Sequence, residues 1–256
     1  MISNYYKTFA ATVILASSLF SLSTPALAFD ANDKPAVEKI IREYLLQNPE
    51  LILEVQQALE QKQQLATAER SARALSENKE TVFNSPNQAA IGNPNADVTV
   101  VEFFDYNCGF CQRAMRDMNS LLAKDAGLQF VLKELPILSE GSVEAHKIST
   151  AVYRLYPKKY EEFHNKLLGG QGQKDGNRAL RVAQEMKMDV DAISNESKKG
   201  DVLGAFREVN DLANKLGING TPSYVIGNEV VFGALGEDVL RQKIENVRKC
   251  GKTVCS

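Results

Sequence analysis

The sequence lacks several features that would assign it to a class at once. Its 256 residues carry a formal net charge of only −2, which gives no reason to expect a nucleic-acid partner. After the first 28 residues, no stretch reaches about eighteen consecutive apolar residues, so we expect the remaining chain to be soluble. Only four cysteines and two histidines are present, which leaves few ligands for a zinc site. The chain is long enough for one or two domains with a sizeable core.

The first residues have the parts of a secretory signal peptide. Lys7 precedes the apolar run FAATVILASSLFSL, and the small residues Ala26 and Ala28 precede a plausible cleavage site. We therefore predict a signal peptide over residues 1–28, with the mature chain beginning at Phe29; a retained N-terminal anchor is the alternative. No cysteine stands at the cleavage site, so lipoprotein processing is not expected. Export would place all four cysteines where disulfides form and persist.

Residues 29–84 are predicted to form a helical extension used for oligomerisation. Asn48-Pro49 is typical of a helix N-cap followed by proline, so we expect a short helix to about Gln47 and a longer helix after it. The heptad-like seam of these helices consists of Val37, Ile41, Tyr44, Asn48, Leu51, Val55, Ala58, Lys62 and Leu65. Because the rest of the segment is strongly polar, we predict self-association, with a dimer as the default. Packing on its own domain, or a loose stalk, is the alternative.

Residues 85–256 have an α/β pattern. A loop over Ser85–Asp97 precedes an apolar strand over Val98–Tyr106, and a helix and a second buried strand in LQFVLKELPIL follow. A helical block then occupies about residues 142–216. A hairpin turning at Gly227-Asn228 and a last helix complete the predicted order.

The motif NCGFC stands between the first buried strand and the predicted helix. The start of that helix would aim unpaired N–H groups and the positive end of the dipole at Cys108, which lowers the pKa of a thiol. We therefore expect Cys108 to be the exposed attacking cysteine and Cys111 to be the buried resolving one. The alternatives are a static disulfide and a zinc site, for which Cys250 and Cys255 have a poor spacing. The strand–CxxC–helix context favours a redox pair.

Two motifs resemble one known family. VEFFDYNCGFC, together with NGTPSYVIG much later in the chain, is similar to the DsbA family of exported thiol:disulfide oxidoreductases. The resemblance covers about Val98–Lys249 and implies an α/β fold class, a thioredoxin fold with an inserted helical domain. The N-terminal helices are similar to those of the subgroup of about 27 kDa outer-membrane proteins and of oligomeric ScsC-type proteins.

The resemblance also implies a substrate-binding surface. Pro222 would be a cis-proline beside the redox pair, and the backbone of Thr221 would pair with an extended substrate. The strongest oxidases of the family have Pro-His between the cysteines, and that histidine stabilises the thiolate. Gly109 and Phe110 supply no such donor, which indicates a less oxidising pair. The glycine–aromatic filling and Thr221 are similar to the dimeric isomerases of the DsbC type.

A buried acid belongs to the same comparison. Glu102 stands where the family keeps a carboxyl group that exchanges a proton with the second cysteine, here Cys111. A paired acid at the end of a strand is the alternative for Glu102. Lys133, in the second buried strand, is a candidate partner for this carboxylate.

The remaining cysteines and the histidines suggest structural roles. Cys250 and Cys255 can close a small C-terminal disulfide ring, with free thiols or an intermolecular pair as alternatives. His146 and His164 lie in helical patterns and are expected to be surface or packing residues. No metal site and no cofactor are predicted.

Taken together, these features predict an exported thiol:disulfide oxidoreductase that forms and isomerises disulfides in secreted proteins. We expect it in the periplasm, where association with the outer membrane or the cell surface is compatible with the sequence. The resemblance implies a DsbB-like or DsbD-like membrane partner that resets the cysteine pair. The alternative is a non-catalytic binding protein or chaperone that keeps the fold.

Overall fold

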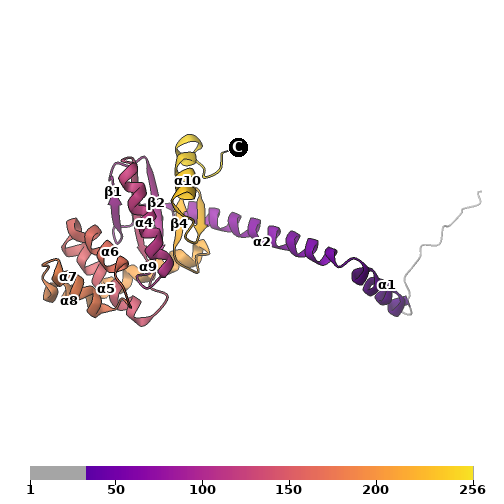
Figure 1. Cartoon of the computed structure of the whole chain (residues 1–256), viewed down its shortest axis with the longest axis horizontal. Helices are drawn as coiled ribbons and strands as arrows, with labels where there is room; N and C mark the ends of the chain where they lie inside the picture. Colours follow the sequence, from indigo (N-terminus) through magenta and orange to yellow (C-terminus); the bar gives the residue numbers. More distant parts are fainter. Residues whose placement is uncertain (1–32, 256) are drawn as a thin grey trace, which may run out of the picture. The chain divides into compact units, whose positions relative to one another are not determined.

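The computed structural model describes residues 33–255 (Figure 1). The predicted signal peptide, residues 1–28, lies outside the described residues. The chain forms two compact units, Met1–Gln57 and Ala58–Ser256. In the part of the chain that is described, no helix is both long enough and apolar enough to cross a membrane.

Helices account for most of the described residues. They span Lys34–Gln47 (α1), Glu50–Glu77 (α2), Lys79–Asn84 (α3), Gly109–Lys124 (α4), Glu140–Leu155 (α5), Tyr160–Gly169 (α6), Gly176–Glu185 (α7), Val190–Ser197 (α8), Gly200–Leu216 (α9) and Glu237–Cys250 (α10). The strands span Ala89–Gly92 (β1), Val98–Phe104 (β2), Leu128–Glu134 (β3), Ser223–Ile226 (β4) and Glu229–Phe232 (β5).

The first unit contains α1 and the start of α2. The predicted helix break beside Pro49 is confirmed, but the predicted capping role of Asn48 is wrong. Both the side-chain amide and the backbone N–H of Asn48 donate to the Tyr44 carbonyl, so Asn48 ends α1 instead of starting α2. No side chain of α1 is buried, and Ile40 and Leu46 are 65% and 69% exposed. This unit therefore presents apolar side chains to its surroundings.

The second unit is built on a five-stranded sheet with the order β1-β3-β2-β4-β5. The central strands β2 and β3 are parallel, and the other neighbours are antiparallel. The prediction of a loop throughout Ser85–Asp97 is wrong at β1, where Ala89–Gly92 pairs with Gln129–Leu132. This pairing with β3 is a tertiary contact, and local sequence did not reveal it.

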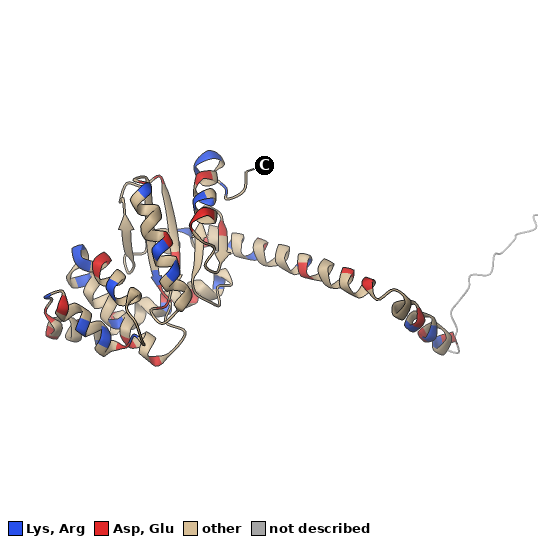
Figure 2. Cartoon of the chain, in the orientation of Figure 1, with Lys and Arg blue, Asp and Glu red and all other residues tan. Residues whose placement is uncertain are grey.

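Helices cover both faces of the sheet. Val100 and Phe104 of β2 face the side of α4 and α10, whereas Val101 and Phe103 face the side of α3, α9 and the end of α2. In Figure 1, α4 runs alongside β2, and α5 to α8 gather beside one end of the sheet. Acidic and basic residues are interspersed along these helices (Figure 2). The predicted α/β fold class, with helices inserted between β3 and β4, is confirmed.

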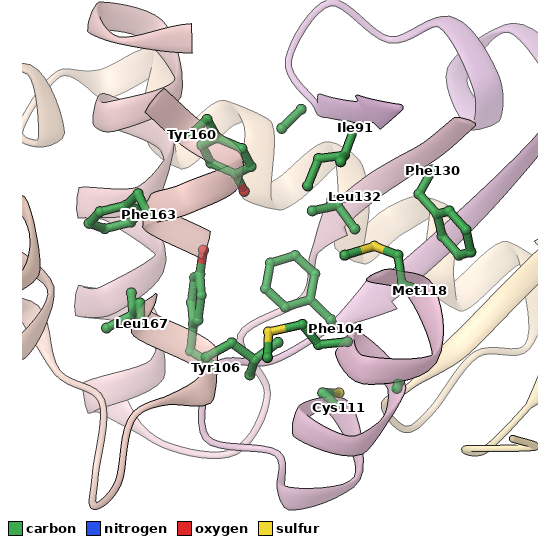
Figure 3. Packing of buried hydrophobic residues seen from close by; sticks show 14 of the residues in the cluster. Ile91, Phe104, Tyr106, Cys111, Met118, Phe130, Leu132, Tyr160, Phe163 and Leu167 are labelled. Carbon is green, nitrogen blue, oxygen red and sulfur yellow. The ribbon is translucent and has the colours of Figure 1, made fainter. Parts of the chain in front are cut away.

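A single hydrophobic cluster joins the sheet to the inserted helices. Figure 3 shows Phe104 and Tyr106 at the end of β2 beside Cys111, with Tyr160 and Phe163 coming from α6. All five side chains are nearly or fully inaccessible to solvent. The segment that carries the cysteines is therefore fixed from both the sheet and the helical insertion.

Candidate active site

Cys108 occupies the N-cap position of α4. Its backbone is extended, and its Sγ accepts a hydrogen bond from the Cys111 backbone N–H at 3.3 Å. Hydrogen bonding with the Cys111 thiol, with smaller contributions from Thr221 and from backbone N–H groups, lowers the pKa of Cys108 to about 6. At neutral pH most of this cysteine is therefore the thiolate, which is the nucleophilic form.

Cys111 has the opposite environment. It lies one turn into α4 and is fully buried. Burial, then the neighbouring Cys108, then Glu102 raise the pKa of the Cys111 thiol well above its usual value. The expected exposed position of Cys108 is wrong: the residue is only 7% exposed, because the Thr221 carbonyl and the start of α4 lie against its sulfur. The two thiols differ chiefly in acidity, so Cys108 can attack first while Cys111 stays protonated.

The loop before β4 lies directly against Cys108. The Thr221–Pro222 peptide bond is cis, and the Thr221 carbonyl oxygen lies 3.1 Å from Cys108 Sγ. The Pro222 carbonyl accepts a hydrogen bond from the backbone N–H of Gly233 at 2.9 Å, which ties the loop to the end of β5. The structure therefore brings together the two motifs that stand far apart in the sequence.

Glu102 lies on β2 under this centre. Only 2% of the residue is exposed, and its strand neighbours are Leu132 of β3 and Tyr224 of β4. Burial, then the charges of Cys108 and Asp117, raise the pKa of the Glu102 carboxyl group from 4.5 to about 8. A carboxyl group with this pKa can both accept and return a proton near neutral pH.

The expected pairing of Lys133 with Glu102 is wrong. Lys133 is the β3 neighbour of Phe103 and points to the other face of the sheet, where its Nζ donates to the Thr81 carbonyl at 2.6 Å. Burial lowers the pKa of this ammonium group from 10.5 to about 8. Neighbouring residues along a strand point to opposite faces, so the partner of Phe103 cannot share the face of Glu102.

Asp105, which was not among the predicted site residues, organises the segment before the cysteines. Its Oδ1 accepts from the Asn107 backbone N–H at 2.8 Å and from Ser142 Oγ at 2.7 Å. Its Oδ2 accepts from the backbone N–H groups of Ile137 and Leu138 at 2.9 and 3.1 Å. The carboxylate therefore joins the ends of β2 and β3 to the start of α5.

Asn107 continues this network into the helical insertion. Its amide pairs twice with the Lys174 backbone: Nδ2 donates to the carbonyl and Oδ1 accepts from the N–H, both at 2.7 Å. An aspartate directly after a strand often accepts from the backbone N–H two residues further on, and this turn pattern could have identified Asp105. The sequence carries no comparable signal for Lys174, which is 67 residues away.

Two family models match parts of the chain that include the cysteine pair and the N-terminal helices. Residues 99–245 match the family model described as the DSBA-like thioredoxin domain, which is more than half of the chain. The chain belongs to this family. A second model, described as the copper resistance protein ScsC N-terminal domain, matches residues 33–66. The predicted membership of a DsbA-like and ScsC-like group is therefore confirmed.

Individual relatives of this DsbA-like protein include solved structures. A thioredoxin-like oxidoreductase from Silicibacter pomeroyi DSS-3 is 38% identical with a TM-score of 0.65, over 68% of this chain and 99% of that chain. A linker-deletion mutant of Proteus mirabilis ScsC is 25% identical with a TM-score of 0.65, over 88% and 99% of the two chains. Disulfide bond formation protein D of Bacillus subtilis is 24% identical over 172 residues, covering 63% of this chain and 78% of that protein.

The two residues between the cysteines of this DsbA-like protein face outward. Phe110 is 57% exposed, and the Arg113 guanidinium lies 4.6 Å from its ring centroid. A Cβ added to Gly109 would meet no atom within 4 Å. Local packing therefore does not require glycine at position 109.

The two histidines are buried in a polar cluster, so the prediction of a packing role is confirmed and the surface alternative is wrong for both. His146 Nε2 accepts from the Tyr106 backbone N–H at 3.2 Å, and its Nδ1 lies 3.5 Å from Glu134. The Tyr106 hydroxyl lies 3.3 Å from His164 Nδ1. Burial, followed by the charge of His146, lowers the pKa of His164 to about 3, so His164 is neutral at physiological pH. The cluster therefore holds Tyr106, two residues before Cys108, in place.

The last two cysteines are separate from the redox motif. Cys250 and Cys255 form a disulfide with a Cα–Cα distance of 6.0 Å, whereas Cys108 and Cys111 are free thiols. Within residues 33–255, no three His, Cys, Asp or Glu side chains are arranged to hold a metal ion. The Cys250–Cys255 ring follows α10 and closes the C-terminal end of that helix.

Proposed function

We propose that this protein is an exported thiol:disulfide oxidoreductase that uses Cys108 and Cys111 as its redox pair. The position of the pair carries the proposal: the Cys108 sulfur caps α4 and lies 3.1 Å from the Thr221 carbonyl oxygen, while Cys111 is buried one turn into the same helix. The opposite pKa shifts of the two thiols support it. The family membership supports the same class of activity. We assign the nucleophilic role to Cys108 and the resolving role to Cys111.

The exchange reaction uses both cysteines in sequence. The Cys108 thiolate attacks a substrate disulfide, forms a Cys108–substrate bond and releases one substrate thiolate, which takes a proton from water. Cys111 then gives its proton to Glu102, attacks Cys108 Sγ and forms the Cys108–Cys111 disulfide. The Cys108–substrate bond breaks with its electron pair on the substrate sulfur. Run in reverse, the same steps oxidise a substrate dithiol.

The cis-proline loop is the proposed substrate-binding edge. Thr221 lies against Cys108 through its carbonyl oxygen, so an extended substrate beside Thr221 would bring its sulfur to Cys108. Phe110 and Gly109 complete this surface because they lie exposed between the cysteines.

The proposed substrates are thiols and disulfides of exported proteins in the periplasm, and the proposed activity includes both disulfide formation and isomerisation. Gly109-Phe110 supplies no side-chain donor to the thiolate, which favours a moderate oxidant over a strong one. A DsbB-like or DsbD-like membrane protein is the proposed recycling partner.

Trapping tests the exchange mechanism. Replacing Cys111→Ala removes the resolving thiol, so disulfide-linked complexes with exported proteins should accumulate through Cys108 and disappear on reduction. The matched variant Cys108→Ser should trap nothing and should lose all oxidase and isomerase activity towards a reduced or scrambled model protein. If Cys108→Ser keeps the cellular phenotype, the protein is a binding protein or chaperone instead.

We further propose that α1 and the start of α2 hold two copies of the chain together. Ile41, Tyr44 and Val55 of the predicted seam are 52%, 57% and 64% exposed, and clustered apolar exposure of this kind marks interaction surfaces. The extension is not uniform, however. Leu75 and Val82, inside the predicted segment 29–84, belong to the core of the second unit.

Substitutions in the first unit test this assembly without disturbing that core. Ile41→Lys with Val55→Lys should convert a dimer into a monomer in a measurement of solution mass, and isomerase activity should fall while oxidase activity remains. The matched exposed variant Leu203→Lys, on α9, should leave the mass unchanged. A wild-type monomer would contradict the assembly, and a larger closed oligomer would contradict the dimer.

A further inference from the structure

Tyr224 is a buried neighbour of Glu102 with no role in the exchange steps proposed above. It lies on β4, two residues after Pro222, and its Cα is the register partner of Glu102 on β2. Only 1% of Tyr224 is exposed, and it belongs to the hydrophobic cluster on the side of α4 and α10. Its ring therefore lies on the same face of the sheet as Glu102 and Cys111.

The hydroxyl group of Tyr224 has no hydrogen-bond partner among the described residues, although it is buried. Leaving a buried hydroxyl unpaired is unfavourable, so such a group needs a physical explanation. After burial, the charges of Glu102, Cys111 and Asp117 raise the pKa of Tyr224, which shows that the phenol lies within electrostatic reach of all three. The phenol consequently stays protonated and remains a donor.

We propose that Tyr224 is a positioning residue whose hydroxyl donates to the Glu102 carboxylate whenever that group is ionised. The inference rests on the proposed function, because Glu102 ionises each time it gives its proton to the Cys111 thiolate. Of the two strand neighbours of Glu102, Leu132 has no polar side chain, so Tyr224 is the neighbour that can donate. The phenol has no acceptor in the described part of the chain, and the ionised carboxylate of Glu102 is a stronger acceptor than the neutral acid.

The charged groups around Glu102 oppose its ionisation, so a hydrogen-bond donor such as the Tyr224 hydroxyl would stabilise the carboxylate. On α4, the Cys108 thiolate and Asp117 both oppose ionisation of Glu102. Burial, and after it Glu237 of α10, raise the pKa of Asp117, whereas Arg116 and Arg113 lower it. Lys133 faces the other side of the sheet and cannot neutralise Glu102. The Tyr224 hydroxyl is thus a neutral donor in a setting where the nearest groups are acids.

Tyr224 does not change which protons and electron pairs move when Cys111 resolves the mixed disulfide. In resolution, the proton moves from Cys111 Sγ to the Glu102 carboxylate, and the electron pair of Cys111 forms the bond to Cys108. The Cys108–substrate bond breaks, and its electron pair stays on the departing substrate sulfur. Tyr224 keeps its own proton throughout and only stabilises the carboxylate before transfer, which lowers the pKa of Glu102 and increases the fraction of base at neutral pH.

Tyr224→Phe in the full chain removes only the hydroxyl. Reduced protein is mixed with an aromatic disulfide that releases a coloured thiol, once when Cys108 attacks and again when Cys111 resolves. The second release should slow about tenfold at neutral pH, and its pH midpoint should rise by about one unit. The first release should not change. The matched variant Tyr153→Phe, a partly buried tyrosine of α5, should change neither release.

A double-mutant cycle separates this role from a packing role. In a Glu102→Gln background, Tyr224→Phe should leave the second release unchanged, since the carboxylate is gone. A packing effect would slow both releases, or lower the melting temperature, without moving the midpoint. An unmoved midpoint in Tyr224→Phe overturns the inference while leaving the exchange activity intact. If wild-type protein shows no second release at all, the proposed function itself fails.

A measurement on the wild-type protein tests the same inference even if Tyr224→Phe does not fold. The buried Tyr224 hydroxyl proton should give a resonance that moves downfield as Glu102 ionises, with its midpoint near the carboxyl pKa of about 8. Glu102→Gln should abolish this movement. A hydroxyl resonance that does not respond to pH in wild-type protein overturns the assignment of Tyr224 as the donor.

Discussion

Glu102 and Lys133 are ionisable side chains buried on opposite faces of the central sheet, and they differ in what surrounds them. Glu102 of β2 lies towards α4 and the cysteines, and Lys133 of β3 lies towards α3 and α9. Burial moves both pKa values to about 8 from opposite directions. Lys133 meets a fixed carbonyl and Glu208, whereas Glu102 meets thiols whose charge changes during the proposed reaction. A shifted pKa alone therefore does not identify a functional group.

The largest expected effect is on the Glu102 side. Between pH 4.5 and about 8, the folded protein keeps a proton on Glu102 that the unfolded chain has lost, so stability falls as pH rises through this window. Glu102→Gln cannot ionise and should be more stable than wild type by about 2–4 kcal/mol near pH 9. The gain should vanish below pH 4.5.

Denaturant unfolding of the reduced proteins at both pH values measures this difference. The release of substrate by Cys111 should slow in the same variant, because the proton acceptor has been removed. A stability gain that is the same at both pH values would mean that Glu102 is not buried as a titrating acid.

A smaller effect is expected on the Lys133 side, with no loss of activity. Between about pH 8 and pH 10.5 the unfolded chain holds a proton that folded Lys133 has lost, so wild-type stability rises with pH there. Lys133→Met should therefore be more stable by about 1–3 kcal/mol at neutral pH, less the cost of an unpaired Thr81 carbonyl. This advantage should disappear above pH 10.5.

Thermal unfolding and the rate of Cys111 resolution together check the Lys133 variant. A stabilised protein with an unchanged resolution rate supports a structural role for Lys133. If Lys133→Met instead shifts the pH dependence of substrate release by Cys111, Lys133 also influences the redox pair, and the proposed difference between the two faces of the sheet is wrong.

The sequence predicted the order of most elements but not the face of each strand residue. The strand before Cys108 and the helix after it follow from a buried apolar run and a CxxC spacing. The assignment of Lys133 to the side of Glu102 failed because both β2 and β3 are almost entirely buried. Strands buried on both faces lack the polar–apolar alternation that would show where each side chain points.

Long-range partners were the other part that local patterns could not supply. Cys108 and Thr221 were linked only through the resemblance to a family, not through any periodicity. Asp105 and His146 carry no local sign that they bond to Ile137 and Tyr106, which are 32 and 40 residues away. Their roles depend on how the helical insertion packs against the end of β2, and only the three-dimensional structure contains that information.

The smallest effect is expected in the histidine cluster beside the sheet, where the buried side chain of Glu134 has hydroxyl partners. Thr150 Oγ1 donates to Glu134 at 2.8 Å, and Ser149 and Tyr160 donate to the other carboxylate oxygen. Because two donors remain, Thr150→Val should cost about 1 kcal/mol in an unfolding measurement. The matched variant Thr99→Val, on β2, should cost less. An equal loss of stability in both variants would show that the hydroxyl donors do not stabilise Glu134. Glu134 and Glu102 would then differ only in that Glu102 lies beside the reactive thiols.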